Sequence, residues 1–413
     1  MNRRFSGMVL VMCLALACVP GRAAAQRVVE SQNAMVVSST VEASEAGLRM
    51  LQEGGNAIDA AAATAFALMV TDPAMCSLAG RSQVLIRLAN GDVVGIDGAT
   101  QSPGGVDEPA RIKQGYGTAP IPGSPAALEE MVTKFGTLPL SKVLQPAIEL
   151  ARDGFVINEE YHQSFRKYGK DFGNYPGTAK HFLRSDGSFY SQGDILKQPA
   201  LASTLERMAA EGSQVLYKGS AGQQIMVDMK EHGGFITLAD LAQYTPLAGE
   251  IVRGHYRGHE IIARGGQCDG ASVIEMLQIL GEFDLEDYFQ HPSRYVGLLA
   301  MLTHVGHQDE MVPDEQQVSQ ATAARRARDI IEGRIVPSAV QQAEEEDPGE
   351  TNHLSVVDAL GNVVSLTQSI GPSFGAKAAH PELGFFYAYS YDMNDDPVPL
   401  QREKTSQSPT ILL

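Results

Sequence analysis

Polar and apolar residues alternate with the period of a β-strand in two neighbouring stretches near the C-terminus of this 413-residue chain. Residues 353–357 and 363–367 both alternate in this way, and the ALGN segment at 359–362 between them has the composition of a turn. The pattern predicts a β-hairpin. The acidic residues 344–350, which include a proline and a glycine, predict a solvated loop before it. Thr351 is therefore expected to open the first strand of the hairpin at an exposed edge.

The N-terminal half begins with a different pattern. Residues 34–37 are apolar and predict a strand, and a helix is expected to begin at Ser44 and to end before the glycines at 54–55. A second helix is predicted from Ala57 to Val70, with Asn56 as its N-cap. This helix is almost entirely alanine and aliphatic residues, so we expect it to be buried on most sides and to pack closely against a neighbour.

Further along, a second hairpin is predicted at residues 84–97. Two apolar runs, 84–88 and 93–97, flank an Asn90-Gly91 turn signal. The spacing from Thr237 to Asp240 is that of a helix capping box. The rest of the chain alternates between helices and short strands, so the sequence predicts a mixed α and β fold.

The first 25 residues have the organisation of a secretory signal peptide. Arg3 and Arg4 precede an apolar run at 8–17, and three alanines precede Gln26. The apolar run is too short to span a bilayer, since a transmembrane helix needs about 20 such residues. We expect a periplasmic or secreted protein that begins at Gln26. Lipoprotein processing at Cys18 is a less favoured alternative, because Ala15 stands where a larger aliphatic residue is normally found.

Composition and short motifs exclude several classes of function. The formal net charge is −17, and this excess of acidic residues argues against nucleic acid or anionic lipid as a partner. Beyond the signal peptide the chain has only Cys76 and Cys268, which we expect to remain separate thiols. The sequence has no HExxH motif, paired CxxC motifs, phosphate-binding loop or GxSxG elbow, so no metal or cofactor is predicted.

Thr351 is the candidate nucleophile. A threonine hydroxyl needs a base to take its proton, and a threonine with a free α-amino group carries that base itself. The ordinary pKa of such an amine, about 7.7–8.0, suits a general base near neutral pH. A free amine requires cleavage of the peptide bond between Glu350 and Thr351. The alternative explanation is that Thr351 is simply a good residue with which to begin a strand.

The segment from Thr351 to Gln368, TNHLSVVD followed by GNVVSLTQ, resembles the start of the small subunit of γ-glutamyltranspeptidases, which are N-terminal nucleophile hydrolases. Four other segments resemble the large subunit of the same family, at residues 43–73, 122–155, 233–260 and 291–300. The resemblance spans most of residues 33–413. It implies an α+β fold, a four-layer αββα sandwich, with residues 26–350 as the large-subunit region and 351–413 as the small-subunit region. Family members continue beyond the position of Leu413 with further strands and an oxyanion-hole glycine pair, so the small-subunit half is expected to be shortened.

The resemblance also implies a mechanism and a set of site residues. The chain is expected to cleave itself between Glu350 and Thr351, and the two fragments are expected to stay associated. The Thr351 hydroxyl then attacks a small γ-glutamyl amide of the glutathione type, and water or an amino acid resolves the acyl-enzyme without a cofactor. Ser369 matches a threonine that supports the nucleophile. The residues that match substrate-binding positions of the family are Asp392, Thr405 and Ser406.

Three differences from the family pattern concern the substrate site. The segment AGRSQ at 79–83 replaces a glycine-rich stretch, and Gly371 replaces an asparagine. Ala99 stands where the family has an arginine that binds the α-carboxylate of the glutamyl group. Losing this bidentate contact removes both affinity and selection. Three alternatives therefore remain open: an acylase for a different acyl group, a catalytically impaired homologue, and a secreted binding protein without enzymatic activity.

Overall fold

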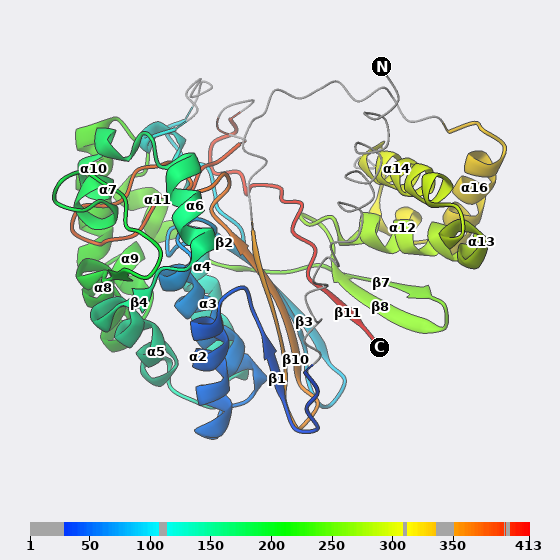
Figure 1. Ribbon diagram of the computed structural model, residues 1–413, viewed down its shortest axis with the longest axis horizontal. Helices are drawn as coiled ribbons and strands as arrows, with labels where there is room; N and C mark the ends of the chain where they lie inside the picture. Colours follow the sequence, from blue (N-terminus) through cyan, green and yellow to red (C-terminus); the bar gives the residue numbers. More distant parts are fainter. Residues whose placement is uncertain (1–28, 107–113, 309–311, 336–350, 392, 394–396) are drawn as a thin grey trace, which may run out of the picture. The chain divides into compact units, whose positions relative to one another are not determined.

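The computed structural model in Figure 1 describes residues 29–106, 114–308, 312–335, 351–391, 393 and 397–413. Residues 34–413 form one compact unit, and residues 1–33 form a separate one of which only the last five are described. Every element discussed below belongs to the larger unit. The predicted signal peptide at 1–25, Glu350 and Asp392 lie outside the described residues.

A six-stranded antiparallel sheet brings the two ends of this unit together. Its strand order is β1-β9-β10-β2-β3-β6, so the hairpin from the C-terminal region lies between strands from the N-terminal region. Both predicted hairpins are confirmed, as β2–β3 and β9–β10. In this order the strands are β1 Met35–Val37, β9 Asn352–Val357, β10 Val363–Ser369, β2 Arg81–Arg87, β3 Val93–Gly98 and β6 Leu247–Ala248.

Helix α3, Ala57–Thr71, packs on one face of this sheet, and each of its residues is buried. Its alanine-rich sequence allows a close approach by α2, Val41–Gln52: a Cβ atom added at Gly47 would lie 2.3 Å from the Thr64 hydroxyl. The predicted burial is thus confirmed, as is the N-cap at Asn56, which forms a capping box with Asp59. The predicted start of α2 at Ser44 is wrong. Thr40 is the N-cap, because its side chain accepts a hydrogen bond from the backbone N–H of Ala43.

The remaining helices of this layer continue along the chain (Figure 1); among them α5 packs on α3, and α4 packs on α3, β2 and β3. The capping box predicted at Thr237 and Asp240 begins one of them. Phe374 and Phe386, from the segment after β10, stack among the aromatic rings of these helices. The elements are η1 Tyr116–Thr118, α4 Ser124–Phe135, α5 Leu140–Asp153, α6 Glu159–Tyr168, η2 Phe172–Asn174, α7 Pro176–Phe182, α8 Pro199–Glu211, α9 Gln214–Tyr217, α10 Ser220–His232 and α11 Leu238–Gln243, with a two-stranded ribbon of β4 Phe155–Val156 and β5 Ile195–Leu196.

A second antiparallel sheet packs against the other face of the first. Its order is β11-β8-β7, and Leu85, Ile262 and Ile411 form the apolar contact between the two sheets. Its own outer face is covered by α12 (Figure 1). The elements are β7 Ile251–Tyr256, β8 His259–Arg264, α12 Gly270–Gly281, α13 Leu285–Phe289, α14 Pro292–Gln308, α15 Asp314–Gln317, α16 Gln320–Ile331 and β11 Thr410–Leu412. The predicted αββα layering is confirmed.

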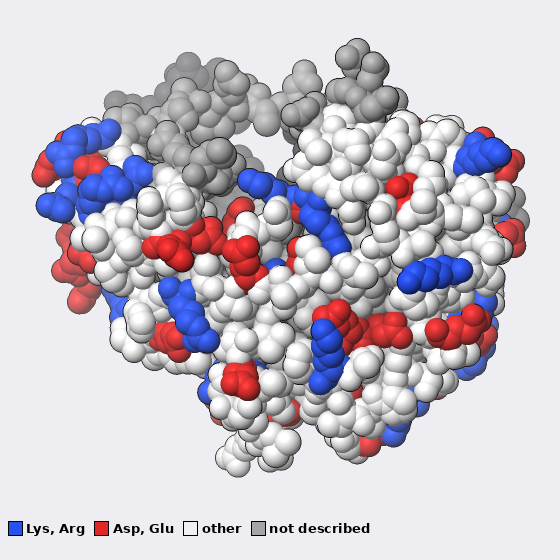
Figure 2. Space-filling model, turned by 180° about the vertical axis from the view of Figure 1, so that it is seen from behind, with Lys and Arg blue, Asp and Glu red and all other residues white. Residues whose placement is uncertain are grey.

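The two cysteines beyond the predicted signal peptide are separate, as expected. Cys76 and Cys268 are both buried and are not joined to each other. Within the described ranges, no helix combines the length and the apolar character that crossing a membrane would require. Figure 2 shows acidic and basic side chains side by side over one face of the molecule. Exposed ion pairs of this kind contribute at most about 1 kcal/mol each.

Candidate active site

Thr351 precedes the first residue of β9 and is exposed. Asn352 at the start of β9 pairs with Gln368 on β10, so extending the register by one residue places Thr351 opposite Ser369. Ser369 in turn pairs with Arg81 on β2. Residues directly opposite one another in a sheet share a face. Thr351, Ser369 and Arg81 therefore form a row across three central strands, and the two predicted catalytic residues are neighbours.

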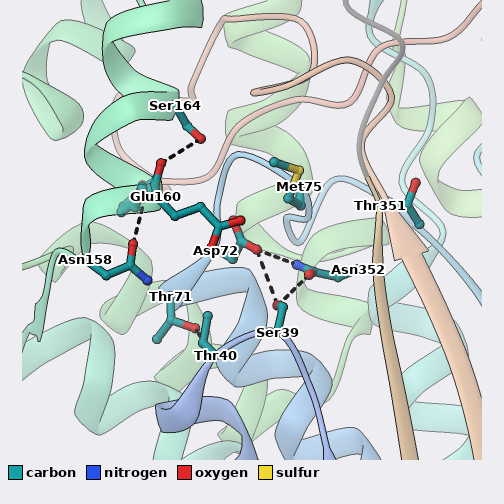
Figure 3. Close-up of a pocket in the computed structure, with 11 residues that line it drawn as sticks. Ser39, Thr40, Thr71, Asp72, Met75, Asn158, Glu160, Ser164, Thr351 and Asn352 are labelled. Carbon is teal, nitrogen blue, oxygen red and sulfur yellow. Dashed lines mark hydrogen bonds between the residues drawn. The ribbon is translucent and has the colours of Figure 1, made fainter. Parts of the chain in front are cut away.

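Asn352 anchors the strand immediately after Thr351. Its side-chain amide donates to Asp72 Oδ2 at 3.0 Å and its amide oxygen accepts from Ser39 Oγ at 2.6 Å. Figure 3 shows Asn352 directed at these two residues, whereas Thr351 points away from them. Asn352 is only 3% exposed, so its hydrogen bonds are protected from water. The position of Thr351 is thus fixed by a buried amide next to it in sequence.

A pocket of about 410 Å³ lies beside Thr351. It is lined by Thr351 and Asn352 from β9, by Asp72 at the end of α3, and by Glu160 and Tyr161 from α6, among others (Figure 3). Asp72 and Glu160 bring two carboxylates to it, and its described lining residues include no lysine, arginine or histidine. The pocket is large enough for a small organic molecule and is acidic.

The backbone turns sharply after Ser369. Gly371 has φ of +88°, and its N–H donates to Ser369 Oγ at 3.1 Å. Phe374 and Lys377 also have positive φ, of 61° each, which is uncommon for residues other than glycine. The family asparagine and the glycine found here are both residues that adopt positive φ readily. The turn thus explains why glycine is an acceptable replacement at 371.

On the other side of Ser369, Arg81 forms a buried ion pair with Glu403, in which both side chains are nearly inaccessible. Glu403 also accepts hydrogen bonds from the Thr100 hydroxyl and from the backbone N–H of Tyr391. The Arg81 guanidinium lies close to Gly371. A cation is therefore present two strands away from the candidate nucleophile, but a carboxylate of the protein itself already neutralises it.

Ala99, at the position of the family arginine, is fully buried. Its N–H donates to Asp97 Oδ1, and its carbonyl oxygen accepts from Tyr244 Oη at 2.7 Å and from Arg402 at 3.2 Å. The Arg402 guanidinium lies over the Tyr244 ring, 4.2 Å from its centre. The surroundings of Ala99 are thus filled by Tyr244 and Arg402.

Two other predicted site residues, Thr405 and Ser406, lie on the segment that leads to β11. Thr405 is half-buried and donates its backbone N–H to Gln267 at 2.9 Å, on the segment that leads to β11. Ser406 is exposed beside it. Neither residue lines the pocket beside Thr351. Asp392 and Glu350 are outside the described residues, so their roles remain predictions.

His353 has a structural position in the sheet. Its Nδ1 lies 2.8 Å from the Thr367 hydroxyl on β10, and its Nε2 lies 3.2 Å from Ser355 Oγ. Burial lowers the pKa of His353, so the ring is neutral at neutral pH. Across the parts of the chain that the structure describes, no group of three or more His, Cys, Asp or Glu side chains is placed to bind a metal ion.

Sequence reasoning missed the residues that hold Thr351 in place. Asp72 follows a long apolar helix, in the segment 43–73 whose resemblance indicated no role for it, and Ser39 follows a short strand outside the matched segments. Only Asn352 could have indicated these contacts from the sequence. It is a polar residue in a predicted strand, next to the candidate nucleophile, and such a residue needs a hydrogen-bond partner once it is buried. Its partners come from more than 200 residues away, at Ser39 and Asp72.

An αββα sandwich with a threonine at the head of a central strand, next to a pocket, is the arrangement expected of an N-terminal nucleophile hydrolase. The family model for gamma-glutamyltranspeptidase matches residues 43–412. The chain belongs to the gamma-glutamyltranspeptidase family.

Relatives of this chain include enzymes of two names. The glutathione hydrolase proenzyme of Escherichia coli (strain K12) is 31% identical over 381 residues, which cover 86% of this chain and 66% of the relative. The acylase ACY 1 proenzyme of Pseudomonas sp. (strain SE83) is 36% identical over 393 residues, which cover 88% of this chain and 70% of the relative. The cephalosporin acylase from Bacillus halodurans matches in structure with a TM-score of 0.80 at 25% identity, over 94% of this chain and 76% of that one. The chain thus spans about two thirds of the length of the first two relatives.

Proposed function

We propose that this protein transfers or hydrolyses the acyl group of small amides, with Thr351 as an N-terminal nucleophile freed by cleavage of the Glu350–Thr351 bond. The observation that carries the proposal is the position of Thr351. It is exposed at the head of β9, opposite Ser369 and beside a pocket of about 410 Å³. Two relatives are named proenzymes, which supports processing into two fragments.

In the proposed reaction the Thr351 hydroxyl attacks the carbonyl carbon of the amide, and the α-amino group of Thr351 takes the hydroxyl proton. The same amine then gives a proton to the leaving nitrogen as the C–N bond breaks. This leaves an ester between the acyl group and Thr351 Oγ. Water or an amine attacks the ester, and Thr351 is regenerated. Ser369 positions Thr351 from the neighbouring strand, and Asp392, Thr405 and Ser406 are proposed to contact the substrate.

The proposed donors are γ-glutamyl amides of the glutathione type, with weak selection for the glutamyl group. A relative named glutathione hydrolase supports this donor class. The weak selection follows from Ala99, because a charge-assisted contact to a carboxylate is worth about 1.5–3 kcal/mol and alanine cannot make it. The second candidate is an acylase for a different acyl group, which Ala99 and the relative named acylase ACY 1 both favour.

We further propose that residues 26–350 and 351–413 are the two fragments of an exported protein that begins at Gln26. The fragments are held together by the central sheet, because β9 pairs with β1 and β10 pairs with β2. Cutting the chain before Thr351 leaves these main-chain hydrogen bonds intact. The fragments are therefore expected to separate only when the protein unfolds.

The first test is self-cleavage. The purified chain is expected to yield a small fragment that begins with TNHLS on N-terminal sequencing, and Thr351→Ala is expected to stay uncut. Thr303→Ala, which removes an exposed hydroxyl on α14, is the control and should be cut normally. A native chain that stays uncut for days and releases no acyl group would contradict the proposed function.

The second test separates the two donor classes. A γ-glutamyl anilide and a glutaryl anilide share the acyl chain, but the glutaryl compound lacks the α-amino and α-carboxylate groups. We expect similar kcat/KM for both, because the missing arginine contact corresponds to roughly one to two decades in kcat/KM. A large preference for the γ-glutamyl anilide would show that another group binds the carboxylate. A large preference for the glutaryl anilide would favour the acylase.

A further inference from the structure

Cys76 lies shortly after the end of α3, and its side chain is a shared hydrogen-bond acceptor for two strands. The side-chain amides of Asn352 on β9 and Gln368 on β10 both donate to its sulfur, each at 3.3 Å. The thiol itself donates to the carbonyl oxygen of Asp72 at 3.6 Å. Cys76 is only 1% exposed, and burial raises its pKa well above the ordinary value, so the sulfur keeps its proton at neutral pH.

The two amides are next to the two predicted catalytic residues in sequence. Asn352 and Gln368 are direct partners in the β9–β10 register, so their side chains share a face of the sheet. This is the face covered by α3, because the Gln368 amide also donates to a carbonyl oxygen of α3. Successive side chains of a strand point to opposite faces, so Ser369 projects from the other face. Figure 3 shows that Thr351 likewise points away from the partners of Asn352.

Both amide groups use their two N–H donors. One N–H of Asn352 binds Asp72 Oδ2 at 3.0 Å, and one N–H of Gln368 binds the Ala65 carbonyl oxygen at 3.1 Å. The second N–H of each amide binds Cys76 Sγ. Asn352 and Gln368 are at most 3% exposed, so removing the sulfur takes the acceptor from two buried donors at once. A cysteine that only filled space in the core would have no such effect.

The residues around Cys76 bind the same part of the chain. They accept from, or donate to, the main chain of the segment that follows β10. These hydrogen bonds are Phe374 N–H to Ala74 O at 2.7 Å, Ile370 N–H to Met75 O at 3.2 Å and Ser77 Oγ to Phe386 O at 2.7 Å. Every one of these contacts, like those of Cys76 with the two amides, joins the proposed fragments 26–350 and 351–413. Residues 74–77 thus connect the larger fragment to the catalytic ends of β9 and β10.

We propose that Cys76 is a positioning residue for the Thr351 nucleophile, acting through the amides of Asn352 and Gln368. The inference rests on the proposed function, because it concerns the same site. The sulfur fixes the ends of β9 and β10 relative to each other and to α3, and thereby keeps Thr351 opposite Ser369. Cys76 makes and breaks no bond in the reaction. Its effect on the rate is geometric, since small displacements of a nucleophile lower the rate strongly.

Two substitutions separate the acceptor from the volume of the side chain. Cys76→Ala removes the acceptor, whereas Cys76→Ser supplies an oxygen that accepts hydrogen bonds. We expect Cys76→Ala to lower the rate of self-cleavage and kcat for the faster of the two anilides about tenfold, with KM unchanged. Cys76→Ser is expected to recover part of this loss. Val143→Ala, which truncates a fully buried apolar side chain of α5, is the control for lost stability and should leave kcat unchanged.

A double variant tests whether Cys76 acts through Asn352. If the two side chains work as one unit, their effects on the rate of self-cleavage do not multiply. Cys76→Ala is therefore expected to slow self-cleavage much less in the Asn352→Ala background than in the native chain. Effects that multiply fully would contradict action through Asn352.

Hydrogen exchange separates this inference from the proposed function, because it requires no activity. In the full-length Thr351→Ala chain, Cys76→Ala is expected to speed amide exchange in peptides that cover β9 and β10, and Val143→Ala is not. Faster exchange in a chain without any acyl transfer would refute the proposed reaction and still support the ordering of the two strand ends by Cys76. The inference would be overturned by native exchange and native rates in Cys76→Ala. Equal rates in Cys76→Ala and Cys76→Ser, or a loss no larger than that of Val143→Ala, would overturn it as well.

Discussion

The buried ion pair of Arg81 and Glu403 allows a quantitative prediction. Glu403→Gln keeps the shape of the side chain but removes its charge, so the Arg81 guanidinium is left in a site that is 5% exposed without a counter-charge. Removing one partner of a buried pair typically costs about 3–5 kcal/mol. The Thr100 hydroxyl and the Tyr391 N–H donate to different oxygens of Glu403, and the introduced glutamine keeps only one oxygen, so we expect a cost of at least the lower end of that range.

Thermal unfolding measures this cost. For a chain of this length, a loss of about 3 kcal/mol corresponds to a fall in Tm of about 4 °C. The double variant Arg81→Gln/Glu403→Gln removes both charges and is expected to recover at least half of the loss, because no unpaired charge remains. Glu260→Gln is the control. It breaks an exposed ion pair with Arg253 at the surface and is expected to change Tm by less than about 1 °C.

The same substitution has a second consequence at the site. Arg81 lies in one row with Ser369 and Thr351, so a guanidinium released from Glu403 can meet the α-carboxylate of a glutamyl group. The ratio of kcat/KM for the γ-glutamyl anilide to that for the glutaryl anilide is expected to rise in Glu403→Gln. A Glu403→Gln protein as stable as the native one, or a double variant less stable than the single one, would refute the reasoning.

Three further predictions concern the surroundings of the site. Asn352→Ala removes the side-chain amide that binds Asp72 next to Thr351. It is expected to slow self-cleavage at least about tenfold, because small displacements of a nucleophile lower the rate strongly. A time course on denaturing gels measures the rate, and cleavage at the native rate would be inconsistent with the prediction. Gly371→Val is expected to destabilise the protein more than Gly371→Asn in urea unfolding, because φ is +88° and asparagine tolerates positive φ; equal losses would argue against a backbone effect. Burial lowers the pKa of His380 to about 4, below its unfolded value near 6.5. The free energy of unfolding should therefore be highest above pH 6.5 and fall by up to about 3 kcal/mol as the pH falls towards 4. His380→Asn should flatten this pH dependence, and an unchanged dependence of stability on pH in the variant would contradict the prediction.

Local signals predicted much of the fold. The alternation at 353–357 and 363–367, the Asn90-Gly91 turn and the Asn56 cap each depend on neighbours in sequence, and each has its expected place in the structure. The start of α2 was misplaced because serine, threonine and glutamate are all suitable near a helix N-terminus. Thr40 rather than Ser44 is the cap, since Thr40 also meets Thr71 across the α2–α3 contact at 2.9 Å.

The site could be predicted only in part. Thr351 and Ser369 lie at the same end of one hairpin, so a local pattern and a resemblance were sufficient to propose both as neighbouring candidates. The partner of Arg81 is 322 residues away in sequence, and the partners of Asn352 are at least 280 residues away. Such pairs form only when the sheet closes, and no periodicity in a single sequence reports them. The acidic pocket arises in the same way, from the end of α3 and the start of α6.

The central place of the β9–β10 hairpin sets an order of events during synthesis. During translation β1 and β2 are synthesised first. The strands β9 and β10, which lie between them in the sheet, follow about 270 residues after the start of β2. The N-terminal part must therefore wait with two strand edges open, and pairing over such a separation is slow. Exposed strand edges are prone to aggregation, so the chain is most liable to aggregate before the β9–β10 hairpin pairs with β1 and β2. Thr351 directly precedes this hairpin, so self-cleavage before Thr351 would occur only after the central sheet has formed.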